Sequence, residues 1–342
     1  MTHRKSLFRL GLALLVCLLF TCTKRSKVGI AFYYWKSDFN LNSSQSNILY
    51  KAAKNNIYIR FFDINWDDKV HKAYPNALIS FKQPTNKLKI TPVIYISNKT
   101  FENINSNDID SLAINSAKLL NELATLQKIR YQDIQIDCDW TISTKDKYFS
   151  FLRSFEKISH RNLEVTIRLH QVKYKETTGV PPVGKGVLMF YNMGKLNADV
   201  IVKSSIYNKA DAGEYVAYLP GYPLKLDVAL PLFSWSIHIR DGRVIQVYEK
   251  IKSVRLNKAG NFKRVGNLYT AKKSFFLSGI YVKENDIFKV EETDLHTLQN
   301  AAQQLAESLP HQNDRTIIYY ELSNLDPTEF SAEAILKVSD RF

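Results

Sequence analysis

The chain has 342 residues, of which 45% are apolar and 12% are aromatic, and it carries a formal net charge of +14. This composition excludes an intrinsically disordered protein and is sufficient for a large buried core, in one large domain or two small ones. The basic residues are scattered and no block of five occurs. We therefore expect a generally basic surface that lies against an anionic envelope, and no nucleic-acid partner.

Residues 1–21 are predicted to be a signal peptide. A basic start precedes the uncharged apolar run 10–20, which is shorter than the ~20 residues that span a bilayer comfortably. The run ends at Thr21-Cys22 and resembles the lipobox of bacterial lipoproteins, although Thr21 replaces the usual Gly, Ala or Ser. A plain signal peptide or an uncleaved anchor is the alternative.

The lipobox resemblance implies that Cys22 is acylated and that residues 22–27 are a tether. The protein would then be exported and anchored in the bacterial cell envelope, on its periplasmic or outer-surface face. Removal of the signal peptide would leave 44 basic and 33 acidic residues, a net charge of +11. Cys138 would be the one cysteine of the mature body, so no internal disulfide is expected.

Eight short runs rich in β-branched and aromatic residues follow. Each is nearly continuous in apolar content, as strands covered on both faces require. Between them lie amphipathic segments such as 109–126 and 147–158, whose apolar residues recur with helical spacing. This alternation predicts an α/β fold, a (β/α)8 barrel of TIM type, over residues 28–342. The predicted strands are 28–35, 57–62, 90–96, 134–137, 163–169, 187–191, 226–233 and 316–320.

Residues 236–292 interrupt the alternation. They contain strand-like runs at 244–247, 274–282 and 288–290, separated by turn signals such as Asp241-Gly242. We expect an antiparallel β insertion between the seventh strand and a helix that starts near Asp294. An insertion at this point lies on a loop at the carboxyl ends of the barrel strands, where barrel enzymes keep their active sites.

Aromatic, acidic and amide side chains gather where the predicted strands end. The carboxyl ends of barrel strands surround one shared pocket. Rings beside carboxylates and amides are typical of sugar sites, because rings stack on CH faces and hydroxyls need directional partners. The predicted substrate-binding residues are Trp35, Asp63, Trp66, Trp140, His170, Met189, Tyr191, Asn192, Trp235 and Tyr320.

Residues 134–141, with the sequence IQIDCDWT, resemble the strand-four signature D-x-x-D-x-D-x-E of family 18 glycoside hydrolases, the chitinase-like barrels. Asp137 and Asp139 match the second and third acids of this signature. Ile134 replaces its first aspartate, and Thr141 replaces its glutamate.

Two further motifs support the resemblance. Residues 189–192, MFYN, are similar to the M-x-Y-[D/N] of strand six. Tyr320-Glu321-Leu322, with Asp326, resembles the W-E-L…D of strand eight, with tyrosine in place of tryptophan. The three motifs occur in the family's order, so the resemblance covers most of residues 28–342. It points more narrowly to uncharacterised envelope proteins of chitinase-like type.

The resemblance implies a mechanism in which a glutamate protonates the glycosidic oxygen and the preceding aspartate orients the substrate's N-acetyl group as the nucleophile. Thr141 cannot release a proton at useful pH, so this mechanism cannot run through position 141. The loss matters because general acid catalysis contributes about 10²–10⁴-fold. Catalysis could still use Asp137 and Asp139, which could share a proton, or Glu321.

Three functions remain open from the sequence. The first is a lipid-anchored barrel that binds a glycan or amino-sugar oligomer without turnover. The second is an active glycoside hydrolase with a relocated acid, and the third is an envelope scaffold whose pocket is vestigial and whose insertion makes the contacts. In each case we expect a monomer without a cofactor or a metal, since no histidines have zinc-ligand spacing.

Overall fold

The computed structural model describes residues 28–194, 196–201, 203–249 and 251–342. The predicted signal peptide, Cys22 and the tether lie outside the described residues. In the part of the chain that is described, no helix has both the length and the apolar character needed to cross a bilayer.

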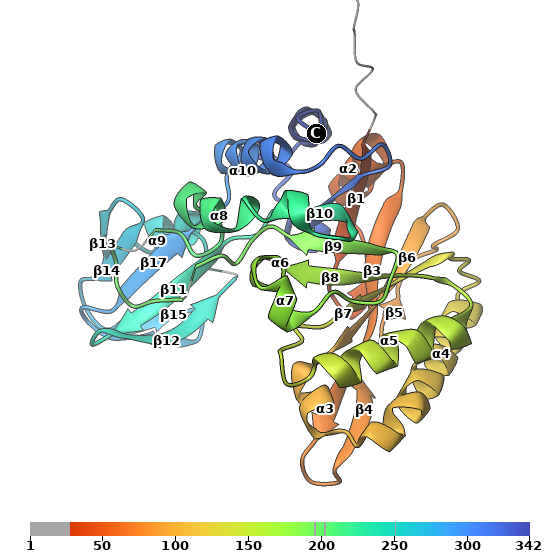
Figure 1. The fold of residues 1–342 in the computed structure, drawn as a ribbon. Coiled ribbons are helices and arrows are strands. Elements are labelled where there is room, and N and C mark those ends of the chain that lie inside the picture. The colour runs from red at the N-terminus through yellow and green to blue at the C-terminus, as the bar shows by residue number, and fades with distance from the viewer. Residues whose placement is uncertain (1–27, 195, 202, 250) are drawn as a thin grey trace, which may run out of the picture.

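Eight parallel strands form a closed barrel within the described residues (Figure 1). They are β1 (Gly29–Tyr34), β3 (Asn56–Asp67), β6 (Lys89–Ile96), β7 (Asp133–Asp137), β8 (Asn162–Arg168), β9 (Lys185–Met189), β10 (Lys225–Pro231) and β18 (Thr316–Tyr320). Each strand pairs with the next, and β1 pairs with both β18 and β3, which closes the ring. The predicted (β/α)8 barrel is confirmed, with all eight strands in the expected order.

The outside of the barrel is covered by helices. They are α2 (Ser43–Ala53), α3 (Asn98–Asn103), α4 (Ile109–Leu126), α5 (Lys145–Ser159), α6 (Leu169–Lys173), α7 (Lys175–Thr178), α8 (Lys209–Val216), α10 (Leu295–Ser308) and α11 (Ala332–Ser339), with the 3₁₀ turns η1 (Ser106–Asp108), η2 (Leu219–Gly221) and η3 (Leu322–Asn324). Helix α4 has the predicted bounds and buries the predicted stripe that includes Leu112 and Leu120. Helix α10 begins after Asp294, whose side chain accepts a hydrogen bond from the Thr297 amide at 2.7 Å.

The barrel interior contains a chain of polar side chains between aromatic layers. The Tyr33 hydroxyl donates to Gln135 Oε1 at 2.7 Å, and Gln135 Nε2 donates to Glu164 Oε1 at 3.0 Å. Lys185 then pairs with Glu164 at 2.9 Å and with Asp227 at 2.8 Å. Buried charges are tolerated when they are paired in this way.

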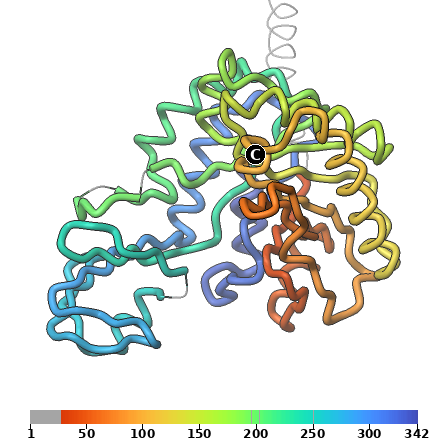
Figure 2. Tube along the Cα trace, turned by 90° about the horizontal axis from the view of Figure 1, so that it is seen from below, coloured from red at the N-terminus to blue at the C-terminus, as the bar shows by residue number. Residues whose placement is uncertain are grey.

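The predicted insertion is confirmed as an antiparallel sheet with strand order β12-β11-β17-β14-β13. It forms a lobe beside the barrel, drawn cyan to blue in Figures 1 and 2. Its own core includes Phe262, Tyr269 and Phe288. The elements are β11 (Trp235–Arg240), β12 (Arg243–Tyr248), α9 (Ser253–Ala259), β13 (Phe262–Val265), β14 (Leu268–Ala271), β15 (Phe275–Leu277), β16 (Ile280–Val282) and β17 (Ile287–Glu291).

Several details of the insertion and of the barrel rim differ from the prediction. The run 274–282 is a hairpin of β15 and β16, because Ser278 and Gly279 both have positive φ and turn the chain. Trp235 starts the insertion's first strand instead of closing the seventh barrel strand. At the rim, β3 continues into a hairpin with β4 (Lys72–Asn76), and β2 (Asp38–Phe39) pairs with β5 (Ser80–Phe81).

Candidate functional site

A cavity of about 250 Å³ opens at the carboxyl ends of the barrel strands. It is bounded by side chains from β1, β3, β6, β7, β8 and β18 and by the end of β9 with the two residues near its exit. Acids, arginines and aromatic rings share this small space. The lining residues are Tyr33, Trp35, Arg60, Asp63, Tyr95, Asp137, Asp139, Arg168, Met189, Tyr191, Asn192 and Tyr320.

Asp137 is the last residue of β7 and lies at the bottom of this cavity, with 5% of its surface exposed. The Thr166 hydroxyl donates to Asp137 Oδ1 at 2.6 Å. Burial raises the pKa of Asp137 to about 6; the positive charge of Arg168 lowers it, and the negative charge of Asp139 raises it. The carboxyl group therefore carries a proton in part of the molecules at mildly acidic pH.

Asp139 lies above Asp137 and is bound by Arg168, the last residue of β8. Arg168 Nε donates to Asp139 Oδ1, and Arg168 Nη2 donates to Asp139 Oδ2 at 3.1 Å. Such a two-pronged pair is strong and fixes both groups. Burial disfavours the charged form of Arg168, but Asp139 and Asp137 outweigh it, so the pKa of this guanidinium is raised.

Thr141 is exposed at the start of the loop that leads to α5. Its hydroxyl lies 2.9 Å from Ser143 Oγ, and its amide donates to Thr144 Oγ1 at 2.9 Å. These contacts shape a turn at the start of the helix. Thr141 lines a neighbouring groove but not the cavity that holds Asp137.

Arg60 and Asp63 form the opposite wall. Arg60 Nη1 lies 3.6 Å from Asp63 Oδ2, and its guanidinium lies 5.5 Å from the centre of the Trp35 ring. Burial raises the pKa of Asp63, and Arg60 lowers it in part. Asp63 Oδ1 has no hydrogen-bond partner among the described residues. The Asp63 side chain borders the cavity, and this oxygen is buried within its wall.

A wall of aromatic rings completes the cavity. The Tyr320 ring lies 5.5 Å from Tyr191 and 5.6 Å from Trp35, and Tyr191 donates its hydroxyl to Met189 Sδ at 2.9 Å. Tyr95 closes the side near Asp137; burial and the nearby aspartates raise its pKa to about 12. These rings supply apolar contact area with hydroxyls at its edge.

A second groove, of about 460 Å³, adjoins the cavity on the β7–β9 side. The two hollows share Asp139, Arg168, Tyr191 and Asn192. His170 lines the groove, and burial lowers the pKa of its imidazole. The two hollows therefore adjoin each other at these four shared residues.

Three of the predicted substrate-binding residues lie outside both hollows or are inaccessible. Trp140 is fully buried: its ring stacks on Tyr148 at 5.3 Å, and its Nε1 donates to the Thr178 carbonyl at 3.0 Å. Trp66 packs on the outer core beside the β3–β4 hairpin. Trp235 Nε1 donates to Glu291 Oε2 at 3.0 Å at the root of the insertion. The Trp140 ring is therefore packed in the core, although the residue borders the second groove, and the other two residues do not line the cavity.

Glu321, a predicted catalytic candidate, does not line the cavity either. Its Oε2 accepts the Trp35 amide at 3.1 Å, and its Oε1 accepts Ser323 Oγ and Asn324 Nδ2, each at 2.6 Å. Burial raises the pKa of Glu321, and the hydrogen bonds from Ser323 and from the Trp35 amide lower it in part. The carboxylate ties the ends of β1 and β18 together, so its placement supports a structural role.

The structure also brings in residues that the sequence prediction omitted. Arg168, Arg60 and Tyr95 all line the cavity. Arg168 is the second-last residue of the predicted strand 163–169, two residues before His170, and this position was a usable signal. Arg60 had no such signal, because a bulge between Arg60 and Phe62 shifts the register of β3 and changes which side chains face inward. Within the described residues, no group of His, Cys, Asp and Glu could hold a metal ion.

No protein-family model matches the sequence, and no curated protein matches it. Among solved structures, the spore cortex-lytic enzyme SleL of Bacillus megaterium QM B1551 aligns over 94% of this chain and 75% of its own, with 14% identity and a TM-score of 0.56. A chitinase-like agglutinin from Robinia pseudoacacia aligns over 90% and 99%, with 12% identity and a TM-score of 0.55. YKL-39 aligns over 92% and 98%, with 10% identity and a TM-score of 0.51. The chain therefore has the (β/α)8 fold of the chitinase-like barrels.

Proposed function

We propose that this barrel binds an amino-sugar oligomer at the carboxyl ends of its strands and does not hydrolyse it by the substrate-assisted mechanism of chitinases. One observation carries the proposal. Arg168 engages both carboxylate oxygens of Asp139, and the resemblance to the chitinase signature assigns this aspartate the task of orienting the N-acetyl group. In that signature Thr141 stands where the proton donor is needed.

The pairing of Asp139 affects each part of that mechanism. The negative charge of a carboxylate held in two charge-assisted hydrogen bonds is compensated by its partner. Such a carboxylate cannot turn toward a substrate without breaking these bonds. The Thr141 hydroxyl supplies no proton at neutral pH. No free side chain is therefore left to orient the N-acetyl group or to protonate the glycosidic oxygen. The cavity walls that would contact a sugar are still present.

The remaining surfaces fit a sugar chain. Trp35, Tyr191 and Tyr320 offer ring faces and edges, and Asp63 offers a buried acceptor without a partner among the described residues. Two of the structural neighbours give a precedent for binding on this fold, since one is named an agglutinin and YKL-39 was solved in the presence of chitooligosaccharides. Another neighbour is a lytic enzyme, so the fold alone does not decide between binding and turnover.

A glycoside hydrolase with a relocated acid is the second candidate, and the pKa of Asp137 near 6 favours it. An acid with this pKa could donate a proton to a leaving group at mildly acidic pH. Its Oδ1 is occupied by Thr166, and its burial limits its reach. Turnover that follows protonation near pH 6 and disappears in Asp137→Asn would establish this alternative.

The proposal is tested by titration calorimetry of the full chain with amino-sugar oligomers of increasing length, followed by chromatography of the same samples. The expected result is saturable binding that tightens with length, without shortened products. Trp35→Ala should weaken binding. Trp66→Ala is the matched control, because this ring lies outside both hollows. Absence of binding by the wild type across the series would rule the proposal out.

We further propose that the protein is exported, acylated at Cys22 and anchored in the cell envelope as a monomer. The support is the basic start, the short apolar run and the cysteine that follows it. Cells that express the full chain and are fed a labelled fatty acid should label the wild type and not Cys22→Ala. Equal labelling of both chains, or recovery of the wild type in the cytosol, would contradict this part of the proposal.

A further inference from the structure

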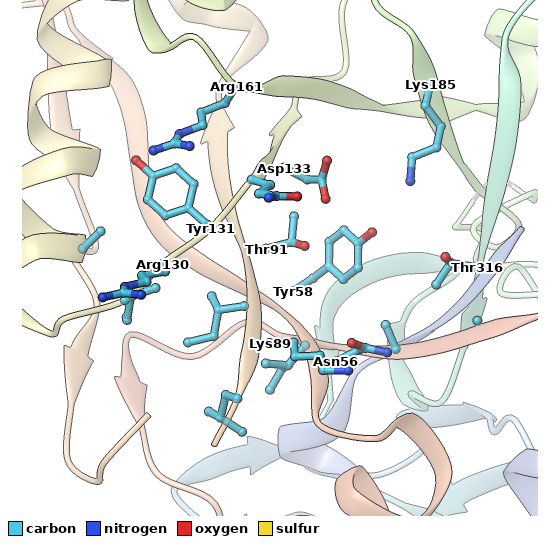
Figure 3. Close-up of a pocket in the computed structure, with 18 of the residues that line it drawn as sticks. Asn56, Tyr58, Lys89, Thr91, Arg130, Tyr131, Asp133, Arg161, Lys185 and Thr316 are labelled. Atoms are coloured by element: carbon cyan, nitrogen blue, oxygen red, sulfur yellow. The ribbon is translucent and has the colours of Figure 1, made fainter. Parts of the chain in front are cut away.

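A second cavity, of about 790 Å³, lies at the amino ends of the barrel strands, opposite the Asp137 cavity (Figure 3). Its lining includes residues at the starts of β1, β3, β6, β7, β9 and β18. Thr91, Tyr58 and Asn56 provide polar side chains within it. This end of the barrel is therefore open and hydrophilic.

Basic side chains surround the opening. In Figure 3, Arg130 and Arg161 lie beside Tyr131, and Lys89 and Lys185 lie on other sides of the cavity. Further lysines are exposed on the loops that lead into the same ends of the strands. The exposed basic residues of these loops and strand starts are Lys54, Lys87, Lys89, Lys128, Arg130 and Arg161.

Most exposed basic groups at this end lack acidic partners, although Lys225 lies 3.6 Å from Asp314. Among the described residues, none of those six side chains forms an ion pair, and Arg161 instead lies 5.4 Å from the Tyr131 ring. Lys185 is different, because Glu164 and Asp227 compensate its charge. Asp133, an acid that lines the cavity, accepts a hydrogen bond from Asn162 at 2.9 Å.

The two ends of the barrel thus differ in their electrostatics. At the carboxyl end each arginine of the cavity faces its own carboxylate, as Arg60 faces Asp63 and Arg168 faces Asp139. At the amino end Lys185 and Lys225 have carboxylate partners, but the six exposed cations named above have none among the described residues. An exposed cluster of unpaired cations attracts an anionic surface.

We propose that this amino-end face docks on the phosphate-bearing headgroups of an anionic lipid bilayer. The position of β1 favours a bilayer over other anions. Its first residue, Gly29, lies at this face, where its amide donates to the Arg315 carbonyl at 2.8 Å. Cys22 precedes Gly29 by seven residues, which reach at most about 25 Å when fully extended. An anchor at Cys22 would hold this face against the membrane.

The sequence between the two positions adds to the attraction, since residues 23–27 read TKRSK and carry three more basic side chains. In this orientation the Asp137 cavity points away from the membrane, toward polymers of the envelope. The docking does not depend on glycan binding, because it uses the other end of the barrel. The six exposed charges belong to the barrel itself, whereas the choice of a bilayer as the anion rests on the proposed anchor at Cys22.

The test is hydrogen exchange of the full chain reconstituted in two kinds of vesicle, one of phosphatidylcholine and one of equimolar phosphatidylcholine and phosphatidylglycerol. We expect slower exchange with the anionic vesicles in segments 84–89, 127–133 and 159–163, and unchanged exchange in the carboxyl-end segments 67–72 and 139–144. Added salt should remove the difference, because it screens exposed charges.

A charge-reversed variant makes the test specific. Lys89→Glu, Arg130→Glu and Arg161→Glu together should abolish the lipid-dependent protection. Lys69→Glu, Lys72→Glu and Lys263→Glu, which make the same change of charge at exposed positions elsewhere, should retain it. Unchanged exchange in β9 and β10 confirms that either variant is folded.

Three results would overturn the docking proposal. They are equal exchange with both vesicles, equal protection at the two ends of the barrel, and protection that survives the amino-end charge reversal. None of these results depends on whether a glycan binds, so failure of the docking and failure of the proposed function are distinguishable.

Discussion

The guanidinium of Arg168 holds both carboxylate oxygens of Asp139, at the point where β8 and the loop after β7 meet over the cavity. This pair converts an acid that could orient a substrate into half of a fixed ion pair. It also places a delocalised cation beside the buried Asp137. The pair therefore determines what chemistry the cavity can support.

Restoring the missing acid alone should not restore hydrolysis. In Thr141→Glu the new carboxylic acid faces an Asp139 that Arg168 still holds, so we expect no turnover of amino-sugar oligomers. In Thr141→Glu with Arg168→Met the aspartate is released, and we expect hydrolysis at least about 10²-fold above the single variant. Reducing-end release measures both. Equal activity of the single and double variants would show that the ion pair is not inhibitory.

The ionised side chain of Asp137 should lower the free energy of unfolding at neutral pH. Its pKa is raised to about 6 from an ordinary value of 3.8, so the folded state binds its proton more tightly than the unfolded state does. The penalty is fully present above pH 6, on the order of 3 kcal/mol, and disappears below about pH 4. Asp137→Asn should therefore raise the free energy of unfolding at pH 8 and leave it nearly unchanged at pH 4.

Urea titrations at the two pH values measure this effect. Asp133→Asn is a suitable control, because Asp133 is exposed on the same strand. The opposite pattern, a variant that loses stability at pH 8, would mean that Arg168 stabilises the charged form more than burial opposes it.

Substitution of Trp35 should affect ligand binding, whereas substitution of Trp140 should affect the stability of the fold. Trp35→Ala should weaken binding of an amino-sugar oligomer by about tenfold or more, since it removes a ring from the cavity wall. Trp140→Ala should instead lower the free energy of unfolding by about 3–5 kcal/mol, because it empties a fully buried site. Calorimetric binding and urea unfolding, measured on both variants, distinguish the two roles.

Glu321 should behave as a structural residue. Glu321→Ala leaves the Trp35 amide and two side-chain donors without their acceptor, so we expect a loss of about 1–3 kcal/mol in the free energy of unfolding. Glu321→Gln keeps part of the acceptor set and should lose less. A glutamine variant with native stability that loses turnover would instead identify Glu321 as a catalytic acid.

The barrel could be predicted from the sequence because its strands are buried on both faces and therefore read as continuous apolar runs. The start of helix α10 could also be predicted, since the helix begins after Asp294, which caps it. The hairpin at Ser278-Gly279 carried a turn signal that a longer apolar run, 274–282, obscured.

The site was less predictable, for three physical reasons. Strand β7 ends at Asp137, so strand alternation does not extend to Trp140, whose ring turns into the core. The bulge in β3 changes which side chains face inward beyond Arg60. The Arg168–Asp139 pair joins residues on two different elements, and single-sequence patterns do not specify such contacts.

The central claim is that the carboxyl-end cavity binds an amino-sugar oligomer and leaves it intact. Titration of the full chain with a chitooligosaccharide, with mass analysis of the sugar recovered from the calorimeter cell, tests it most directly. The account predicts saturable heat that Trp35→Ala weakens, and an oligomer of unchanged length. Shortened products from the wild type that are absent with Asp137→Asn would contradict it, as would the absence of any binding.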